Sequence, residues 1–162
     1  MSLLMEKMPG LGKLIEPALL AELCRGFADL HQVGLRVYDM DGTQLAHRDH
    51  AHALWSYLFE DRTSKAEFTA FVNRIKTDDR RGDSVKVHTE PVTGTHFAVF
   101  PIIYEFDVIG HLVVGPYRPD TERPTQSAGA SELIELIDQV SVWCIDALSQ
   151  QVGLLQKSIE IA

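Results

Sequence analysis

The stretch from residue 84 to residue 117 constrains the fold most, because three apolar segments follow one another closely there. They are Ser84–Thr89, His96–Tyr104 and Val108–Tyr117. Short links around Val92-Thr93-Gly94 and Glu105–Asp107 separate them. Links of this length join antiparallel neighbours, whereas parallel strands need a much longer crossover. The stretch therefore predicts an antiparallel three-stranded meander.

A second hairpin is predicted nearer the N-terminus. Leu35–Tyr38 alternates between apolar and polar residues, as a half-buried strand does. Asp41-Gly42 is a strong hairpin-turn signal, and Thr43–Ala46 would be the returning strand. Together with the meander, this hairpin predicts five antiparallel strands.

Three helices are expected between and before these strands. Apolar residues at helical spacing predict a helix from Ile15 to Gln32, ended by Gly34. The segment "ALWSYLF", residues 53–59, suggests a short helix. Another helix would begin at Ser64, which has Glu67 three residues later, as in a capping box. Its apolar face would consist of Phe68, Phe71, Val72 and Ile75.

The C-terminal part predicts one long helix from about Ser131 to Ile159, within a helical region of residues 130–160. Apolar residues recur there at steps of three and four. The order of elements predicts an α+β fold, in which a five-stranded antiparallel sheet carries its helices on one side. We expect residues 1–12 to be a lead-in and residues 13–162 to form a single domain, because 162 residues suit one domain.

Composition narrows the class of protein. The net charge is -8 and no basic stripe is visible, which argues against binding to nucleic acid or to an anionic membrane surface. No apolar run approaches the roughly 20 residues of a membrane span. Cys24 and Cys144 lie far apart in helical patterns, which predicts two buried thiols in a reducing cytoplasm. We therefore expect a cytoplasmic protein.

The segment "VYDMDGTQL", residues 37–45, resembles the first motif of haloacid-dehalogenase-type phosphatases, in which the first Asp attacks phosphorus. Asp39 would then be the nucleophile, at the end of a buried parallel strand. Arg36 instead suits a half-exposed strand, and the motifs that should follow are missing, since the acidic pair Asp78-Asp79 follows a helix. We predict no catalytic residues and no enzyme, and interpret Asp41-Gly42 as a hairpin tip.

Two stretches resemble the PocR-type sensory domain, a relative of the PAS and GAF ligand-binding folds. They are "LAELCRGFADLHQVGLRVYDMDGTQLA", residues 20–46, and "HFAVFPIIYEFDVIGHLVVGPYRP", residues 96–119, about a third of the chain. The resemblance implies a five-stranded antiparallel sheet with flanking helices. It also implies a cavity between sheet and helices for a small organic molecule such as a diol. The clustered cysteines that family members often carry are missing from residues 56–79. We expect no cofactor.

Candidate ligand-binding residues come from the expected cavity walls. They are Trp55, Tyr57, Phe97, Phe100, Tyr104, His111 and Tyr117, with His88 and His96 as further polar candidates. The alternative is that both faces of the strand His96–Tyr104 are simply buried in the core. "HRDHAH", residues 47–52, contains three His and one Asp, which suit Zn²⁺. No second group of ligands is evident in the sequence, so no metal site is predicted.

The apolar stripe of the long C-terminal helix predicts an interface, because it is longer than a small domain needs. Its candidate residues are Trp143, Leu148, Val152 and Leu155. A homodimer through the flanking helices is expected, and packing of the whole helix on its own sheet is the alternative. Two functions stay open. One is a sensor of a small organic molecule that acts through a separate signalling protein. The other is an adaptor in signalling or cell polarity, with its pocket filled by side chains.

Overall fold

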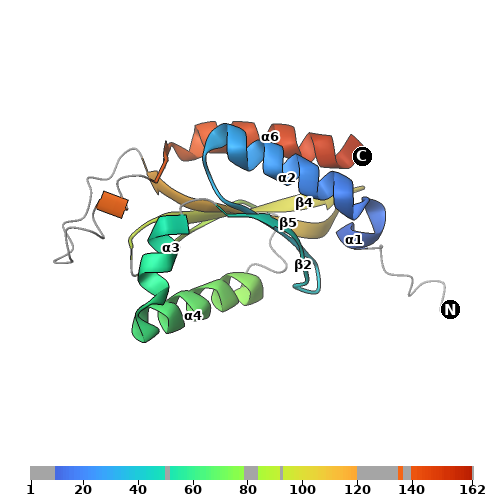
Figure 1. Cartoon of the computed structure of the whole chain (residues 1–162). Helices are drawn as coiled ribbons and strands as arrows, with labels where there is room; N and C mark the ends of the chain where they lie inside the picture. The colour runs from blue at the N-terminus through green and yellow to red at the C-terminus, as the bar shows by residue number, and fades with distance from the viewer. Residues whose placement is uncertain are drawn as a thin grey trace.

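An antiparallel sheet with the strand order β2-β1-β5-β4-β3 lies at the centre of the molecule (Figure 1). The computed structural model describes residues 10–49, 52–78, 84–91, 93–119, 135–136 and 140–161. The strands are β1 Leu35–Asp39, β2 Gln44–Arg48, β3 Lys86–Thr89, β4 His96–Tyr104, β5 Asp107–Pro119 and β6 Val142–Trp143. The five predicted antiparallel strands are confirmed, and β6 adds a sixth that pairs in parallel with the end of β5.

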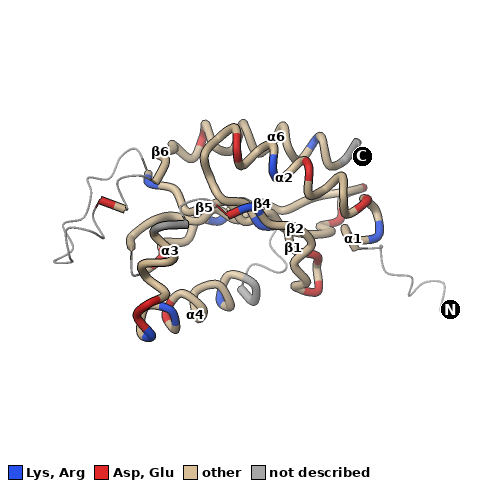
Figure 2. The backbone as a smooth tube through the Cα atoms, viewed as in Figure 1, with Lys and Arg blue, Asp and Glu red and all other residues tan. Residues whose placement is uncertain are grey.

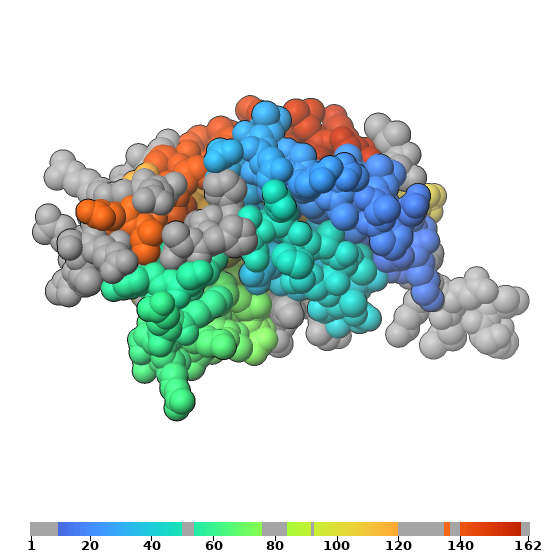
Figure 3. Space-filling model, in the orientation of Figure 1, coloured from blue at the N-terminus to red at the C-terminus, as the bar shows by residue number. Residues whose placement is uncertain are grey.

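Helices cover both faces of this sheet rather than the one side that the sequence predicted (Figure 1). The described helices are α1 Leu11–Leu14, α2 Pro17–His31, α3 His52–Phe59, α4 Arg62–Asp78 and α6 Ile145–Ile161. Helices α2 and α6 lie on one face, while α3 and α4 lie on the other and form a lobe that stands out from the body (Figures 1 and 3).

The two-sided cover follows from the alternation of side chains along β4. Phe97 and Val99 are buried among the side chains of α3 and α4, in what we term the α3/α4 core. Ala98, Phe100 and Ile102 are buried on the opposite face, in the α2/α6 core. Full burial of a large apolar side chain stabilises the fold by about 1.5–3 kcal/mol, so a strand that is apolar on both faces needs cover on both. Burial of both faces is therefore confirmed.

Each core contains residues from several elements. The α3/α4 core consists of Tyr38, Leu54, Trp55, Leu58, Phe68, Phe71, Ile75, Phe97, Val99, Val113 and Val140. The α2/α6 core consists of Leu11, Ile15, Leu20, Cys24, Phe27, Val33, Leu35, Val37, Ala46, Ala98, Phe100, Ile102, Ile109, Leu112, Val114, Tyr117, Leu148, Val152, Leu155 and Ile159.

The predicted long C-terminal helix is wrong, because the chain is extended at β6 between Val140 and α6. Val140 packs in the α3/α4 core and Leu148 in the α2/α6 core, so this segment must pass from one face of the sheet to the other. Backbone pairing stabilises the extended conformation, since the Arg118 amide donates to the Ser141 carbonyl oxygen at 2.8 Å. Residues 131–134 and 137–139 of the predicted helix lie outside the described residues.

Two helix ends also differ from the prediction. Gln32, in the left-handed conformation with φ 58°, ends α2, so Gly34 is not its C-cap. Helix α4 begins at Arg62. The side chain that accepts a hydrogen bond from a backbone amide at its N-terminus is that of Asp61, not that of Ser64. The Ser64 hydroxyl and amide both donate to Asp61 Oδ2, and they hold the pKa of this exposed carboxyl below its usual value.

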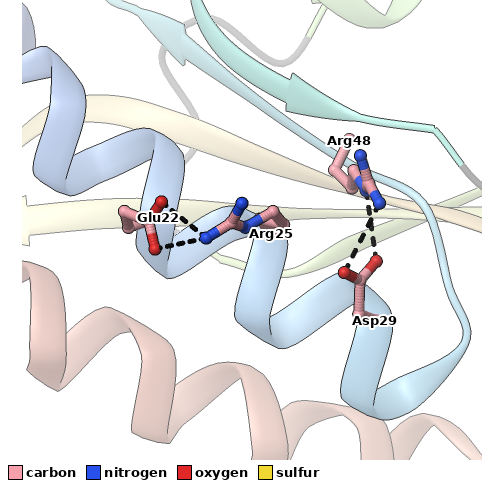
Figure 4. Close-up of polar contacts among 4 residues, drawn as sticks. All are labelled: Glu22, Arg25, Asp29 and Arg48. Carbon is pink, nitrogen blue, oxygen red and sulfur yellow. Dashed lines mark hydrogen bonds and ion pairs between the residues drawn. The ribbon is translucent and has the colours of Figure 1, made fainter.

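The edge strand β2 is tied to α2 by an exposed ion pair (Figure 4). Arg48 donates through Nε to Asp29 Oδ1 at 3.1 Å and through Nη2 to Asp29 Oδ2 at 3.4 Å. Because both side chains are about half exposed, the pair contributes at most about 1 kcal/mol.

The β1–β2 turn explains the Asp-x-Asp-Gly sequence without catalysis. Gly42 has a positive φ of 89°, and the Thr43 amide donates to Asp41 Oδ1 at 2.9 Å. Asp39 accepts from the Met40 amide at 2.8 Å and, through its other oxygen, from the Gly12 amide in α1 at 3.2 Å. The hairpin prediction is confirmed, and Asp39 joins its tip to α1.

Helix α1 also revises the predicted lead-in of residues 1–12. Leu11 is 1 % exposed and belongs to the α2/α6 core. A Cβ atom on Gly10 would overlap the Asp39 carboxylate. Residues 10–12 are therefore part of the packed body, and residues 1–9 lie outside the described part of the chain.

We expect Asp39→Ala to lower the free energy of unfolding by about 1–2 kcal/mol, because it removes the acceptor of two backbone amides. The measurement is urea denaturation followed by circular dichroism. Asp41→Ala is the matched control, since it removes one exposed hydrogen bond and should cost less. An Asp39→Ala protein with wild-type stability would contradict a stabilising role for the two hydrogen bonds that Asp39 accepts.

Candidate functional site

A pocket lies between the sheet and the helices α3 and α4. Its lining residues are Arg36, Tyr38, Asp49, Trp55, Phe68, Val72, Ile75, Phe97, Val113, Gly115 and Pro116. The space between its atoms, open mouth included, measures about 430 Å³, while the centre of a water molecule can occupy about 20 Å³. The latter volume admits about one water molecule, so an organic ligand requires α3 and α4 to move outward.

Aromatic side chains form one wall of this pocket. The ring of Trp55 from α3 lies 4.6 Å from that of Phe68 from α4, and 6.2 Å from that of Phe97 on β4. These centroid distances are typical of packed aromatic pairs. The wall therefore suits the apolar body of a small molecule.

The only charged residues among the described residues that line the pocket are Arg36 and Asp49. Arg36 Nη2 donates to Asp49 Oδ1 at 3.4 Å, and the two side chains are 28 % and 32 % exposed. Strand alternation places Arg36 here, because its neighbours Leu35 and Val37 occupy the α2/α6 core on the other face. An apolar pocket with a few polar groups is the usual form of a small-molecule site.

Two of the seven predicted ligand-binding residues, Trp55 and Phe97, line this pocket. Tyr57 packs against the α3/α4 core beside it. His111 is paired in register with Tyr38, which lines the pocket, so His111 lies on the pocket face of the sheet. His111 itself is not among the lining residues. Phe59 at the end of α3 is 40 % exposed.

The other three predicted residues lie on the opposite face of the sheet. Phe100 and Tyr117 are buried in the α2/α6 core, and burial raises the pKa of Tyr117 to about 12. Tyr104 lines a second pocket, where the centre of a water molecule can occupy about 120 Å³. The remaining lining residues of that pocket are Leu11, Leu14, Ile15, Ile102, Ile109 and Ile159. It is roomier, but none of the described residues that line it carries a charge to orient a ligand, so we favour the pocket of Arg36.

The two further histidine candidates lie apart from both sites. His88 lines a third, open pocket with Phe71 and Arg74. His96 packs edge-on against the ring of Tyr117, with the centroids 5.7 Å apart. Neither side chain lines the pocket of Arg36.

The "HRDHAH" segment is described only in part. His47 Nδ1 lies 3.1 Å from Gln44 Nε2, and Asp49 pairs with Arg36. His50 and the side chain of His52 lie outside the described residues. Within the described chain, no three His, Cys, Asp or Glu residues are grouped as metal ligands would be.

The predicted interface residues on α6 need correction. Leu148 and Val152 are 0 % exposed and Leu155 is 5 % exposed, all within the α2/α6 core, so they contact the chain's own sheet. Trp143 packs against this core, with its ring 5.5 Å from that of His31. The indole Nε1 of Trp143 has no hydrogen-bond partner among the described residues.

The two thiols differ in their surroundings. Cys24 is buried in the α2/α6 core, and burial raises its pKa to about 12. Cys144 is half-buried, and its sulfur accepts a 3.4 Å hydrogen bond from the Ala147 amide at the start of α6. The prediction of two buried thiols therefore holds for Cys24 alone. Both cysteines are free.

Arg36 and Asp49 were not among the predicted site residues. A signal for Arg36 was available, because a charged residue between Leu35 and Val37 must face away from their core.

The same sequence, compared with known proteins, matches no family model and no curated protein. Within the described residues, no helix is both long enough and apolar enough to cross a membrane.

Proposed function

We propose that this protein is a non-enzymatic, cytoplasmic sensor of PocR- or PAS-like fold, which binds a small organic molecule and acts through a separate signalling protein. The observation that carries the proposal is the pocket with aromatic walls and one charged pair. Its position between an antiparallel sheet and flanking helices is where the PocR resemblance implies a ligand. Acidic and basic residues alternate along the described elements instead of forming one basic stretch, so nucleic acid is a poor partner (Figure 2).

A physical connection runs from the pocket side to α2 and α6. Val140 packs in the α3/α4 core that surrounds the pocket. The next residue, Ser141, donates through its hydroxyl to the Gln32 carbonyl oxygen at 2.7 Å, at the end of α2. Trp143 then contacts His31, and α6 begins two residues later. A ligand that holds α3 and α4 in one position can thereby shift an existing equilibrium of α2 and α6.

The two tryptophans of the chain allow a direct test. Trp55 lines the pocket and Trp143 does not, so a Trp143→Phe variant reports on the pocket alone. We expect short-chain alcohols, diols or carboxylic acids to change Trp55 fluorescence with saturation. The reverse variant, Trp55→Phe, retains Trp143, and its signal reports whether the response reaches the segment that contacts His31. A flat Trp55 signal across this panel would contradict the proposal.

The adaptor remains the second candidate, and two observations favour it. The pocket admits about one water molecule without movement of α3 and α4. Leu30 on α2 is 75 % exposed and Leu154 on α6 is 62 % exposed, and an adaptor would use side chains of this kind on these helices. Native mass spectrometry separates the two functions. A dimer that carries a small molecule supports the sensor, and an empty dimer with a flat Trp55 signal supports the adaptor.

A further inference from the structure

We propose that the ligand of this pocket is a small apolar carboxylic acid, whose carboxylate replaces Asp49 as the partner of Arg36. This inference rests on the proposed ligand-binding function and names the chemical class of the ligand. The aromatic side chains of Trp55, Phe68 and Phe97 would hold the apolar body, and Arg36, which lines the same pocket, would hold the acid group.

Arg36 has free capacity for a second carboxylate. A guanidinium group presents five N–H donors in a planar fork that matches a carboxylate with two parallel hydrogen bonds. Among the described residues, only Nη2 of Arg36 is engaged, by Asp49. The 3.4 Å separation is longer than the roughly 2.7–2.9 Å of a strong charge-assisted bond. Asp49 is therefore a weak occupant of a site that can bind a carboxylate more tightly.

Exchange of one carboxylate for another avoids the main electrostatic cost. Arg36 keeps an anionic partner throughout, so its charge is never left unpaired at the pocket wall. Asp49 is 32 % exposed, and its side chain can turn toward water when it is displaced. The net charge of -8 opposes anions in general, but charges farther away than about 10 Å are screened at 0.1 M salt. The positive charge of Arg36 therefore dominates the electrostatic potential at the pocket wall.

The same exchange offers a route to a structural response. Asp49 directly follows β2, and α3 begins three residues later at His52. Helix α3 carries Trp55, which forms part of the pocket wall. Because Asp49 and Trp55 line the same pocket, release of Asp49 from Arg36 would couple binding of the acid to α3.

A neutral ligand predicts the opposite role for Asp49. An alcohol or amide would accept a hydrogen bond from Arg36 and donate one to Asp49, so both side chains would contribute to its affinity. For a carboxylic acid, Asp49 is a competitor for Arg36. The sign of the effect of Asp49→Ala therefore distinguishes the two classes of ligand.

The test uses matched acids and amides of increasing size, which are acetate and acetamide, hexanoate and hexanamide, and benzoate and benzamide. Dissociation constants are measured by Trp55 fluorescence in the Trp143→Phe protein. We expect at least one acid to bind about tenfold or more tightly than its amide. Asp49→Ala should tighten the acid roughly two- to fivefold. Arg36→Gln should bring the acid to the affinity of the amide, and Arg36→Lys should keep part of the preference.

Three outcomes would overturn the inference, and they differ in what they leave standing. If Asp49→Ala weakens acid and amide alike, Asp49 is a ligand acceptor and only the carboxylate assignment falls. Equal affinity for each acid and its amide has the same consequence. If none of the six probes changes Trp55 fluorescence but an alcohol or a diol does, only the carboxylate assignment falls. A flat signal with the alcohols and diols as well removes the ligand-binding function together with the assignment. Should Arg36→Gln fail to fold, the sign of the Asp49→Ala effect still decides.

Discussion

Leu148→Ala is expected to lower the free energy of unfolding by about 2–5 kcal/mol. The side chain is 0 % exposed and lies in the α2/α6 core, so its truncation removes apolar contacts and leaves a cavity. The total stability of a domain is about 5–15 kcal/mol, which makes this loss a large fraction of it. The measurement is the midpoint of urea denaturation, compared between proteins whose unfolding free energy falls with urea concentration at the same slope.

Leu154→Ala is the matched control, because it makes the same chemical change on the same helix. Leu154 is 62 % exposed, so its truncation should change stability by no more than about 0.5 kcal/mol. Equal losses for the two variants would contradict the packing of α6. A Leu148→Ala protein that kept its stability but lost self-association would restore the predicted interface at this residue.

Gly110→Ala is expected to destabilise the protein by about 1–3 kcal/mol. A Cβ atom at this position would lie 2.6 Å from the Tyr38 carbonyl oxygen and 3.2 Å from Leu11 Cδ2. Gly110 is paired with Asp39 of β1 on one side and with Ile102 of β4 on the other. The clash therefore falls on backbone inside the sheet, which cannot move without loss of strand pairing.

Gly153→Ala provides a control of opposite sign. Its Cβ atom would meet nothing within 4 Å, and the residue lies inside α6. Because alanine favours a helix over glycine, the variant should gain about 0.5–1 kcal/mol. Thermal unfolding measures both changes. A neutral or stabilising Gly110→Ala substitution would mean that β1 and β5 are less closely packed than described.

Local signals in the sequence were enough to predict most elements. The turn at Asp41-Gly42 and the short links of the meander specify hairpins through nearest neighbours in the chain. The face of α4 was also predictable, since Phe68, Phe71 and Ile75 are all buried. In each case, the interactions that decide the structure lie within a few residues of one another.

The candidate site was predicted only in part, because it depends on which face of the sheet each strand residue occupies. Phe97 and Phe100 are three positions apart on β4, and an odd spacing places them on opposite faces. Only Phe97 can therefore line the pocket of Arg36. Asp49 lies two residues beyond His47, the partner of Arg36 across the β1–β2 hairpin, so the register of this hairpin brings the two charges together.

By itself, the sequence determined the hairpins, the antiparallel sheet and the two apolar faces of β4, because turn residues and side-chain alternation act locally. Only the tertiary structure decided that helices cover both faces, that the C-terminal segment is extended at Val142 and Trp143, and that Arg36 and Asp49 line a pocket with residues of α3 and α4. The physical reason is the same in each case. These features arise from contacts between residues that are distant in the chain. The free energy of such contacts outweighs the local preference for a helix, and it depends on where the whole sheet lies.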